Sequence, residues 1–286
     1  FKSNINYFAI IIGGALFGAG MMIADGCSSR SIVKFSQGDA NALVTLLFIA
    51  IFAFASTKGV LFVLVNGFIN NQFMIDISSN LSNFTLNIYF VLVILVLILA
   101  YFVKKVKRVF SLYDGVIIGF LIGFAWFISG YIGAESIEKE IQVQALSYVF
   151  PSAKTLEFFT SYEVTELSIG VCIVLGAAFG AYFSTFFNKK YSFGCTSKMN
   201  FNKLKYNMIG GSMMGIGGIM AIGCTVGQGL SGVSTLVFSS FLAIISIGVS
   251  GFITGKILYK KNKLPMCFLF EWENDDKKQK PLDYEI

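Results

Sequence analysis

The chain has 286 residues, of which 55% are hydrophobic and only 13% are charged, with a mean hydropathy of +0.72. Soluble domains carry about a quarter charged residues, so the composition excludes an ordinary soluble domain and is typical of a membrane protein. The net charge of +6 does not indicate nucleic-acid binding, because Lys and Arg lie between apolar runs, as they do in membrane proteins.

Apolar runs recur along the whole chain, and a run needs about 17–25 residues to cross a bilayer. The predicted crossings are Tyr7–Ala24, Ala40–Ala55, Phe84–Val103, Tyr113–Gly130, Glu166–Phe187, Asn207–Ile222 and Thr235–Tyr259, with Gly59–Phe73 as a weaker candidate. We therefore predict an all-α polytopic membrane protein with about seven to nine transmembrane helices and short re-entrant helices.

Charged residues between the apolar runs predict the orientation. Basic clusters lie at Lys104–Arg108, Lys189–Lys205 and Lys256–Lys263, whereas the loop Ala134–Thr165 holds five Glu against two Lys. The positive-inside rule then places the basic loops and the tail Asn262–Ile286 in the cytoplasm, and the acidic loop outside. Within that loop, the helical spacing of its apolar residues predicts a short amphipathic helix at the outer surface, formed by Ile137, Ile141, Ala145 and Tyr148.

Two stretches of the chain match each other at a fixed offset of 197 residues. Residues Gly13–Cys27 read GGALFGAGMMIADGC, and Gly210–Cys224 read GGSMMGIGGIMAIGC. Six identities align without a gap: Gly13 with Gly210, Gly14 with Gly211, Gly18 with Gly215, Gly20 with Gly217, Gly26 with Gly223 and Cys27 with Cys224. We interpret these stretches as parts of a duplicated, pseudo-symmetric unit, an inverted repeat of the kind found in transporters.

Each matched Cys is followed by a polar run and then by another apolar helix, so the unit reads helix, polar break, helix. This pattern predicts a first transmembrane repeat over residues 1–110, a linking helix and outer loop over 111–165, a second repeat over 166–261 and a tail over 262–286. Cys195 lies twenty-nine residues before Cys224, and the same distance before Cys27 falls before Phe1. We therefore expect the first repeat to lack its N-terminal element.

The polar breaks are the candidate binding site. Irregular polar backbone at bilayer depth is tolerated only where it is buried in protein or lines a wet cavity. Helix N-termini at such a break attract anions, and neutral thiols suit a soft, sulfur-bearing ligand. The candidate pathway residues are Cys27, Cys224, Cys195, Gly26, Gly223, Ser28, Ser29, Arg30, Thr225 and Gln228, with Lys34 adding positive charge to the first break only.

Blander interpretations compete with this one. Cys172 lies within an apolar run, where a buried Cys is usually a small apolar residue, and Cys267 lies in the tail. The Gly spacing also serves helix packing, and Arg30 can anchor a helix end at the interface. The chain has no His, and none of its five Cys forms a CxxC pair, so we expect no metal site and no cofactor.

The matched stretches resemble the YeeE/YedE sulfur-transport family, over Gly13–Leu47 and Ile209–Leu236. The resemblance implies a bacterial inner-membrane protein, not an enzyme, that takes up thiosulfate along a path lined by Cys thiols. By motif match that role falls on Cys27 and Cys224, and Cys195 is the counterpart of the element expected to be missing. The family also implies a cytoplasmic sulfur-carrier protein as a partner.

Two alternatives stay open from the sequence. The same fold would serve selenium species or another small sulfur compound, because the sequence does not discriminate between such cargoes. A membrane sulfurtransferase that uses a Cys persulfide would need a thiol of low pKa and therefore positive neighbours, which only Arg30 and Lys34 supply. A purely structural membrane subunit is disfavoured, because polar breaks at membrane depth are costly.

Overall fold

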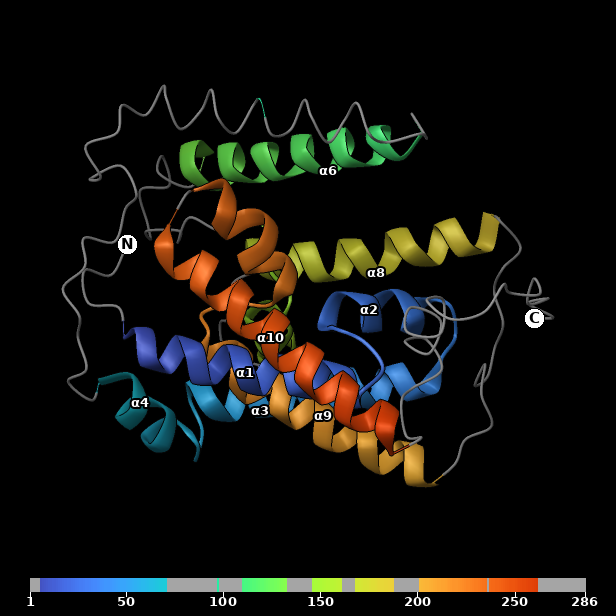
Figure 1. Ribbon diagram of the computed structural model, residues 1–286. Helices are drawn as coiled ribbons and strands as arrows, with labels where there is room; N and C mark the ends of the chain where they lie inside the picture. Colours follow the sequence, from blue (N-terminus) through green and yellow to red (C-terminus); the bar gives the residue numbers. More distant parts are fainter. Residues whose placement is uncertain are drawn as a thin grey trace.

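The computed structural model describes residues 6–70, 97, 110–132, 146–160, 168–187, 201–235 and 237–261. These residues form helices and no strands, in the order α1 (Tyr7–Ile23), α2 (Ser28–Ser36), α3 (Ala40–Thr57), α4 (Phe62–Asn70), α6 (Phe110–Phe127), η2 (Ile128–Ile132), α7 (Val149–Thr160), α8 (Ile169–Phe187), α9 (Phe201–Met220), η3 (Gly227–Gly232) and α10 (Phe238–Lys260). The helical prediction is confirmed for these ranges (Figure 1).

Four stretches of helix are long and apolar enough to cross a membrane: Tyr7–Ser36, Ala40–Thr57, Ile169–Phe187 and Phe238–Lys260. Helix α6 with η2 is a shorter apolar helix. Of the weaker candidate, Gly59–Phe73, the described residues 59–70 contain α4, and residues 71–73 lie outside the described part. The predicted crossing Phe84–Val103 lies outside the described residues apart from Leu97, and Cys195 and the tail Asn262–Ile286 lie outside them entirely.

The centre of the molecule is a bundle of α1, α3, α9 and α10, in which α1 packs on α9 and α10 while α9 packs on α3. The backbones of α1 and α9 cross almost directly. A Cβ on Gly217 would lie 2.6 Å from the Gly13 carbonyl oxygen, and one on Gly20 would lie 2.7 Å from that of Gly210. Only glycine permits such an approach, and small residues at helix crossings are the usual packing device in membranes.

These close contacts are reciprocal. Gly14 of α1 faces the Ala243 carbonyl of α10, and the matched Gly211 of α9 faces the Thr45 carbonyl of α3. Side-chain hydroxyls add hydrogen bonds between α10 and α1, since Ser246 Oγ donates to the Ile11 carbonyl over 2.6 Å. Such interhelical hydrogen bonds matter in lipid, where apolar burial gives no preference for protein over acyl chains.

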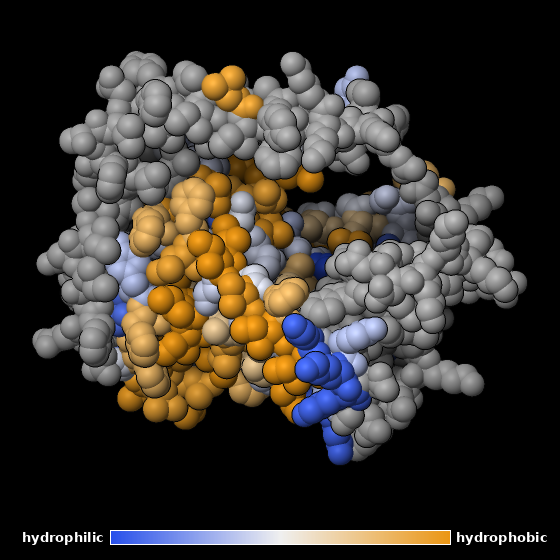
Figure 2. Space-filling view, viewed as in Figure 1, coloured by the Kyte–Doolittle hydropathy of each residue, from blue (hydrophilic) through white to orange (hydrophobic). Residues whose placement is uncertain are grey.

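The surface follows from this packing. Figure 2 shows a broad apolar face over the middle of the molecule and a hydrophilic end where α10 finishes. The charged residues at that end are Lys256, Lys260 and Lys261, all of them exposed. An apolar belt with a basic end is typical of a helix bundle that crosses a bilayer, and the described chain is a multi-pass membrane protein.

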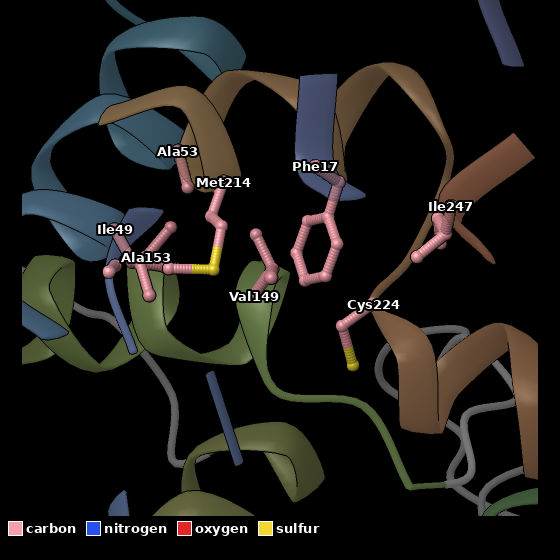
Figure 3. Packing of buried hydrophobic residues seen from close by; sticks show 9 residues of the cluster. Phe17, Ile49, Ala53, Val149, Ala153, Met214, Cys224 and Ile247 are labelled. Atoms are coloured by element: carbon pink, nitrogen blue, oxygen red, sulfur yellow. The ribbon is translucent and has the colours of Figure 1, made fainter. Parts of the chain in front are cut away.

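Helix α7 differs from the expectation for the loop Ala134–Thr165. The residues expected to form a surface helix lie outside the described part, apart from Tyr148, which precedes α7. The described helix is buried instead: Val149 and Ala153 belong to the central core with Phe17 of α1 and Met214 of α9 (Figure 3). Part of the loop therefore enters the bundle, where α7 packs against α3, α8 and α9.

Candidate functional site

The first break begins where α1 ends. Asp25 adopts a left-handed φ of 61° and Gly26 a φ of 145°, a conformation that only glycine takes readily. The Gly26 N–H donates to the Met21 carbonyl over 3.1 Å, which closes the end of α1. The chain then turns, and Cys27, in extended conformation, is the N-cap residue of α2.

The second break repeats this backbone. Ile222 takes a φ of 58° at the position matched to Asp25, which is strained for a β-branched residue. The Gly223 N–H donates to the Gly218 carbonyl over 2.8 Å, as Gly26 does in the first break. After Cys224 the chain re-enters a helix that contains η3, and the Gln228 N–H donates to the Cys224 carbonyl over 2.8 Å.

The two thiols sit at the starts of these helices with different surroundings. Cys27 is half-buried, and its Sγ lies 3.1 Å from Ser29 Oγ. Cys224 is fully buried and accepts a hydrogen bond from the Gly227 N–H over 3.3 Å. Figure 3 shows Cys224 at the edge of the central core, with its sulfur pointing away from Phe17. Both thiols are free, so neither is held in a disulfide.

A third segment, residues 146–148, lies against the second break. Tyr148 packs against the core cluster that contains Cys224 of the second break and Ala24, at the end of α1. Ser231 Oγ donates to the Leu146 carbonyl over 3.0 Å. Ser147 packs on Gly227, where an added Cβ would lie 3.2 Å from its Oγ. Sequence reasoning missed this role of Tyr148, because its apolar spacing indicated a surface helix.

The remaining predicted residues occupy distinct places. Ser28 is fully buried at the start of α2, and its Oγ has no hydrogen-bond partner among the described residues. Gln228 Nε2 donates to the Ala221 carbonyl over 2.9 Å and packs on Gly223. Arg30 is exposed and lies across Gly26, where a Cβ would be 2.9 Å from its Cδ.

Thr225 is half-buried at the start of the second re-entrant helix. Its position there matches that of Ser28 in the first break. Both hydroxyl residues therefore directly follow a candidate Cys, at the end of a helix that carries partial positive charge.

The charge of Lys34 differs from the sequence expectation of an added cation at the first break. Its Nζ donates to Asp25 Oδ2 over 2.9 Å and to the Asp25 carbonyl over 3.1 Å. The ion pair compensates the lysine charge and ties α2 to the turn after α1.

A second set of charges lies at the far end of α7. Lys58, just after α3, donates to Glu157 Oε1 over 2.5 Å, and Lys154 Nζ lies 3.2 Å from Oε2 of the same carboxylate. The hydrogen bond from Lys58 holds the pKa of Glu157 below its ordinary value, although burial acts in the opposite direction. This cluster fixes the end of α7 opposite to Tyr148.

Comparisons with known proteins agree on one class. A family model described as sulphur transport matches residues 2–253. A protein named thiosulfate transporter TsuA from Spirochaeta thermophila is 25% identical over 301 residues, covering 90% of this chain and 79% of that protein. A protein of the same name from Escherichia coli is 20% identical over 266 residues, covering 84% of this chain and 71% of its own length.

Proposed function

The chain belongs to the sulphur-transport family, and we propose that it carries thiosulfate across the bacterial inner membrane between its two helix breaks. The observation that supports this most is the matched left-handed turn before each thiol, since Cys27 and Cys224 then each stand at the start of a helix, and Ala24, at the first break, shares one core cluster with Cys224. Two similar proteins named thiosulfate transporters support the choice of cargo.

The chemistry of the breaks suits a divalent oxyanion that bears a terminal sulfur. Helix N-termini offer N–H groups and partial positive charge without a fixed cation, which would hold an anion too tightly to release it. The buried Ser28 hydroxyl is a donor that a bound oxyanion would satisfy. The thiols of Cys27 and Cys224 are weak donors and polarizable atoms, suited to the sulfur end of the ligand.

Direction follows from the charged end of the bundle. We propose that the end bearing Lys256, Lys260 and Lys261 faces the cytoplasm, as the positive-inside rule requires. The Lys58–Glu157–Lys154 cluster then lies toward the outside. A cytoplasmic sulfur-carrier protein is the acceptor that the family resemblance implies, and the proposal includes it as a partner.

We also propose that the two halves are duplicated units related by a pseudo-twofold axis. The reciprocal contacts of α1 with α9 support this, because Gly13 and Gly217 approach each other as Gly210 and Gly20 do. The equal left-handed turns at Asp25 and Ile222 support it further. Such symmetry would place the binding site where the units meet, as in other transporters with broken helices.

The test is growth of a bacterial strain without thiosulfate importers, supplied with the full-length protein and with thiosulfate as sole sulfur source. We expect the wild type to grow, and Cys27→Ser and Cys224→Ser to lose growth at equal membrane abundance. Cys172→Ser is the matched control, because Cys172 is exposed on α8 and belongs to neither break, and it should grow like the wild type.

The other possible outcomes of this experiment would change the proposed cargo, the proposed site or the proposed class of protein. A well-expressed wild type that does not grow would contradict thiosulfate as cargo, and uptake of selenium species would then be measured. Equal growth of all variants would leave a transporter with the site elsewhere. A persulfide trapped on Cys27 in the purified protein would favour a sulfurtransferase.

A further inference from the structure

A small polar cavity lies beside the first break, between the end of α1, α2, the start of α3 and the first half of α9. It has room for about one water-sized particle. Its walls are formed by Ala24, Asp25, Ser31, Lys34, Asp39, Asn41, Ala42, Thr45 and Asn207. The thiols and Tyr148 are not among these residues, so the cavity is separate from the proposed thiosulfate site although Asp25 is only two residues from Cys27.

The cavity has an excess of negative charge. Two carboxylates, those of Asp25 and Asp39, face one ammonium group, that of Lys34, which leaves a formal net charge of about −1. Lys34 donates to Oδ2 of Asp25 and to its carbonyl. Oδ1 of Asp25 is buried and has no hydrogen-bond partner among the described residues. Burying a carboxylate oxygen without a hydrogen-bond partner costs free energy, unless a cation or a proton binds to it.

The lining is also rich in oxygen. Hydroxyls of Ser31 and Thr45 and the amides of Asn41 and Asn207 surround the two carboxylates. Oxygen ligands of this kind suit hard cations, whereas soft metals prefer sulfur and imidazole. The described residues hold no group of three or more His, Cys, Asp or Glu that would suit a more highly charged metal ion. Net charge and ligand type therefore both favour a monovalent cation.

A purely structural role for the ion pair does not account for these features. The second break makes the same turn with Ile222 in place of Asp25 and Ser231 in place of Lys34. Charge is therefore not needed to form this turn. A buried ion pair is also rarely more stable than apolar packing, so its presence in one break only points to a use beyond stability.

We propose that this cavity binds one small monovalent cation, either Na⁺ or a hydronium ion, which enters the cell together with the anion. This role in uptake rests on the proposed thiosulfate transport, whereas the binding itself does not. The physical reason is that a negative cell interior opposes the entry of a dianion, and each accompanying cation offsets part of that opposition. Asp25 links the two events, because it lies on the strained turn that leads directly to Cys27.

The charged groups around Asp25 decide how a pH effect at this cavity is interpreted. Lys34 approaches from α2 and Asp39 from the turn before α3, while α9 contributes the neutral Asn207. Arg30, on the first turn of α2, packs across Gly26. The spans of α1, α3 and α8 contain no charged residue. A pH effect that disappears in Asp25→Asn therefore reports on this cavity.

The first measurement is binding of ²²Na⁺ to the purified full-length protein in detergent, without thiosulfate. We expect wild-type binding, and a loss of about tenfold or more in affinity for Asp25→Asn. A second variant, Thr45→Val, keeps the test usable if Asp25→Asn does not fold. It keeps the side-chain shape and all charges but removes one oxygen from the cavity lining, and it should weaken binding several-fold. The matched control is Glu157→Gln, which alters a buried, ion-paired carboxylate outside the cavity and should bind like the wild type.

The second measurement separates Na⁺ from hydronium. The melting temperature is recorded in choline chloride at several pH values, and again with NaCl at constant ionic strength and pH. A rise with NaCl that Asp25→Asn lacks assigns the cavity to Na⁺, because a ligand that binds only the folded state stabilises it. A rise on acidification in choline that Asp25→Asn lacks assigns it to hydronium.

The inference is overturned if the wild type and Asp25→Asn behave alike in both measurements. Thiosulfate uptake into vesicles then separates the two proposals. Uptake without cation binding would leave the proposed function intact and remove the cation site. Cation binding without uptake of thiosulfate would remove the proposed function and leave the site.

Discussion

The first break is held by an ion pair, whereas the second, with the same backbone turn, is held by neutral hydrogen bonds. In the first, Lys34 reaches back to the carboxylate and carbonyl of Asp25. In the second, the Gln228 amide reaches back to the Ala221 carbonyl, and Ser231 turns to Leu146 instead. The same turn therefore forms with or without charged side chains, so backbone conformation determines the turn and the first break carries its ion pair in addition.

The two breaks should differ most in the stability that is lost when the ion pair of the first break is broken by replacing Lys34. Lys34→Met leaves the Asp25 carboxylate with no ammonium group, at a site where its side chain is only 11% exposed. We expect a loss of about 3 kcal/mol of stability. Ser231→Ala, at the matched position of the second break, removes one neutral hydrogen bond and should lose about 1 kcal/mol.

Denaturation of both variants in the same detergent checks this prediction. The double variant Asp25→Asn with Lys34→Met should recover part of the loss, because no buried charge is then left alone. Similar losses for Lys34→Met and Ser231→Ala would mean that the two breaks are held with equal strength, against the comparison.

The helix crossing should respond equally on its two sides. Gly13→Ala and Gly210→Ala each place a Cβ 2.6 Å from an atom of the opposite helix, next to Ala221 and Ala24 respectively. We expect each to lose about 2 kcal/mol, since overpacking forces the backbones apart. Melting temperatures measure the loss. Gly119→Ala on α6, where a Cβ meets nothing within 4 Å, is the control and should not lose stability.

The thiols should differ in reactivity as they differ in exposure. In a background with Cys172, Cys195 and Cys267 replaced by Ser, we expect a small maleimide to label Cys27 about tenfold faster than Cys224, a difference of about 1.4 kcal/mol in activation free energy. The reason is that Cys27 is half-buried while Cys224 is fully buried. Mass spectrometry over time gives both rates, and faster labelling of Cys224 would place it, rather than Cys27, nearer to solvent.

The smallest effect concerns Glu157, which lies in neither break. Its pKa in the folded state is lowered, first by the hydrogen bond from Lys58. A lowered pKa means that the stabilising effect is present above the ordinary carboxyl range and is lost as the pH falls through the folded-state pKa. Unfolding of the wild type and of Glu157→Gln, followed from neutral to acidic pH, should therefore converge at the acidic end. A constant difference at all pH values would exclude this linkage.

Much of the architecture could be predicted from the sequence, because length and apolar composition decide whether a helix can cross a membrane. The helices α1, α3, α8 and α10 lie where the apolar runs predicted them. The alignment of Cys27 with Cys224 also located the two turns, since the identical Gly at the turn carries a backbone requirement that the sequence displays directly.

Other features depended on contacts between distant segments. The apolar pattern of Gly59–Phe73 suggested a crossing, and among its described residues Phe62–Asn70 form a helix that begins a few residues after the end of α3. The pattern around Tyr148 suggested a surface helix, yet the following helix enters the core, because its apolar face meets Phe17 and Met214 there. Periodicity shows that a face is apolar and does not show whether lipid, water or another helix covers it.

The sequence by itself therefore determined the class of the molecule, its helices and the two glycine–cysteine turns, because these depend on local composition and on backbone conformation. Tertiary structure decided which groups meet. It packed Tyr148 against the core cluster that holds Cys224, paired Lys34 with Asp25, and enclosed Asp25 in a polar cavity with Asn207 of α9. Those pairings join residues from separate helices, and their energies depend on burial and distance, which arise only when the helices pack.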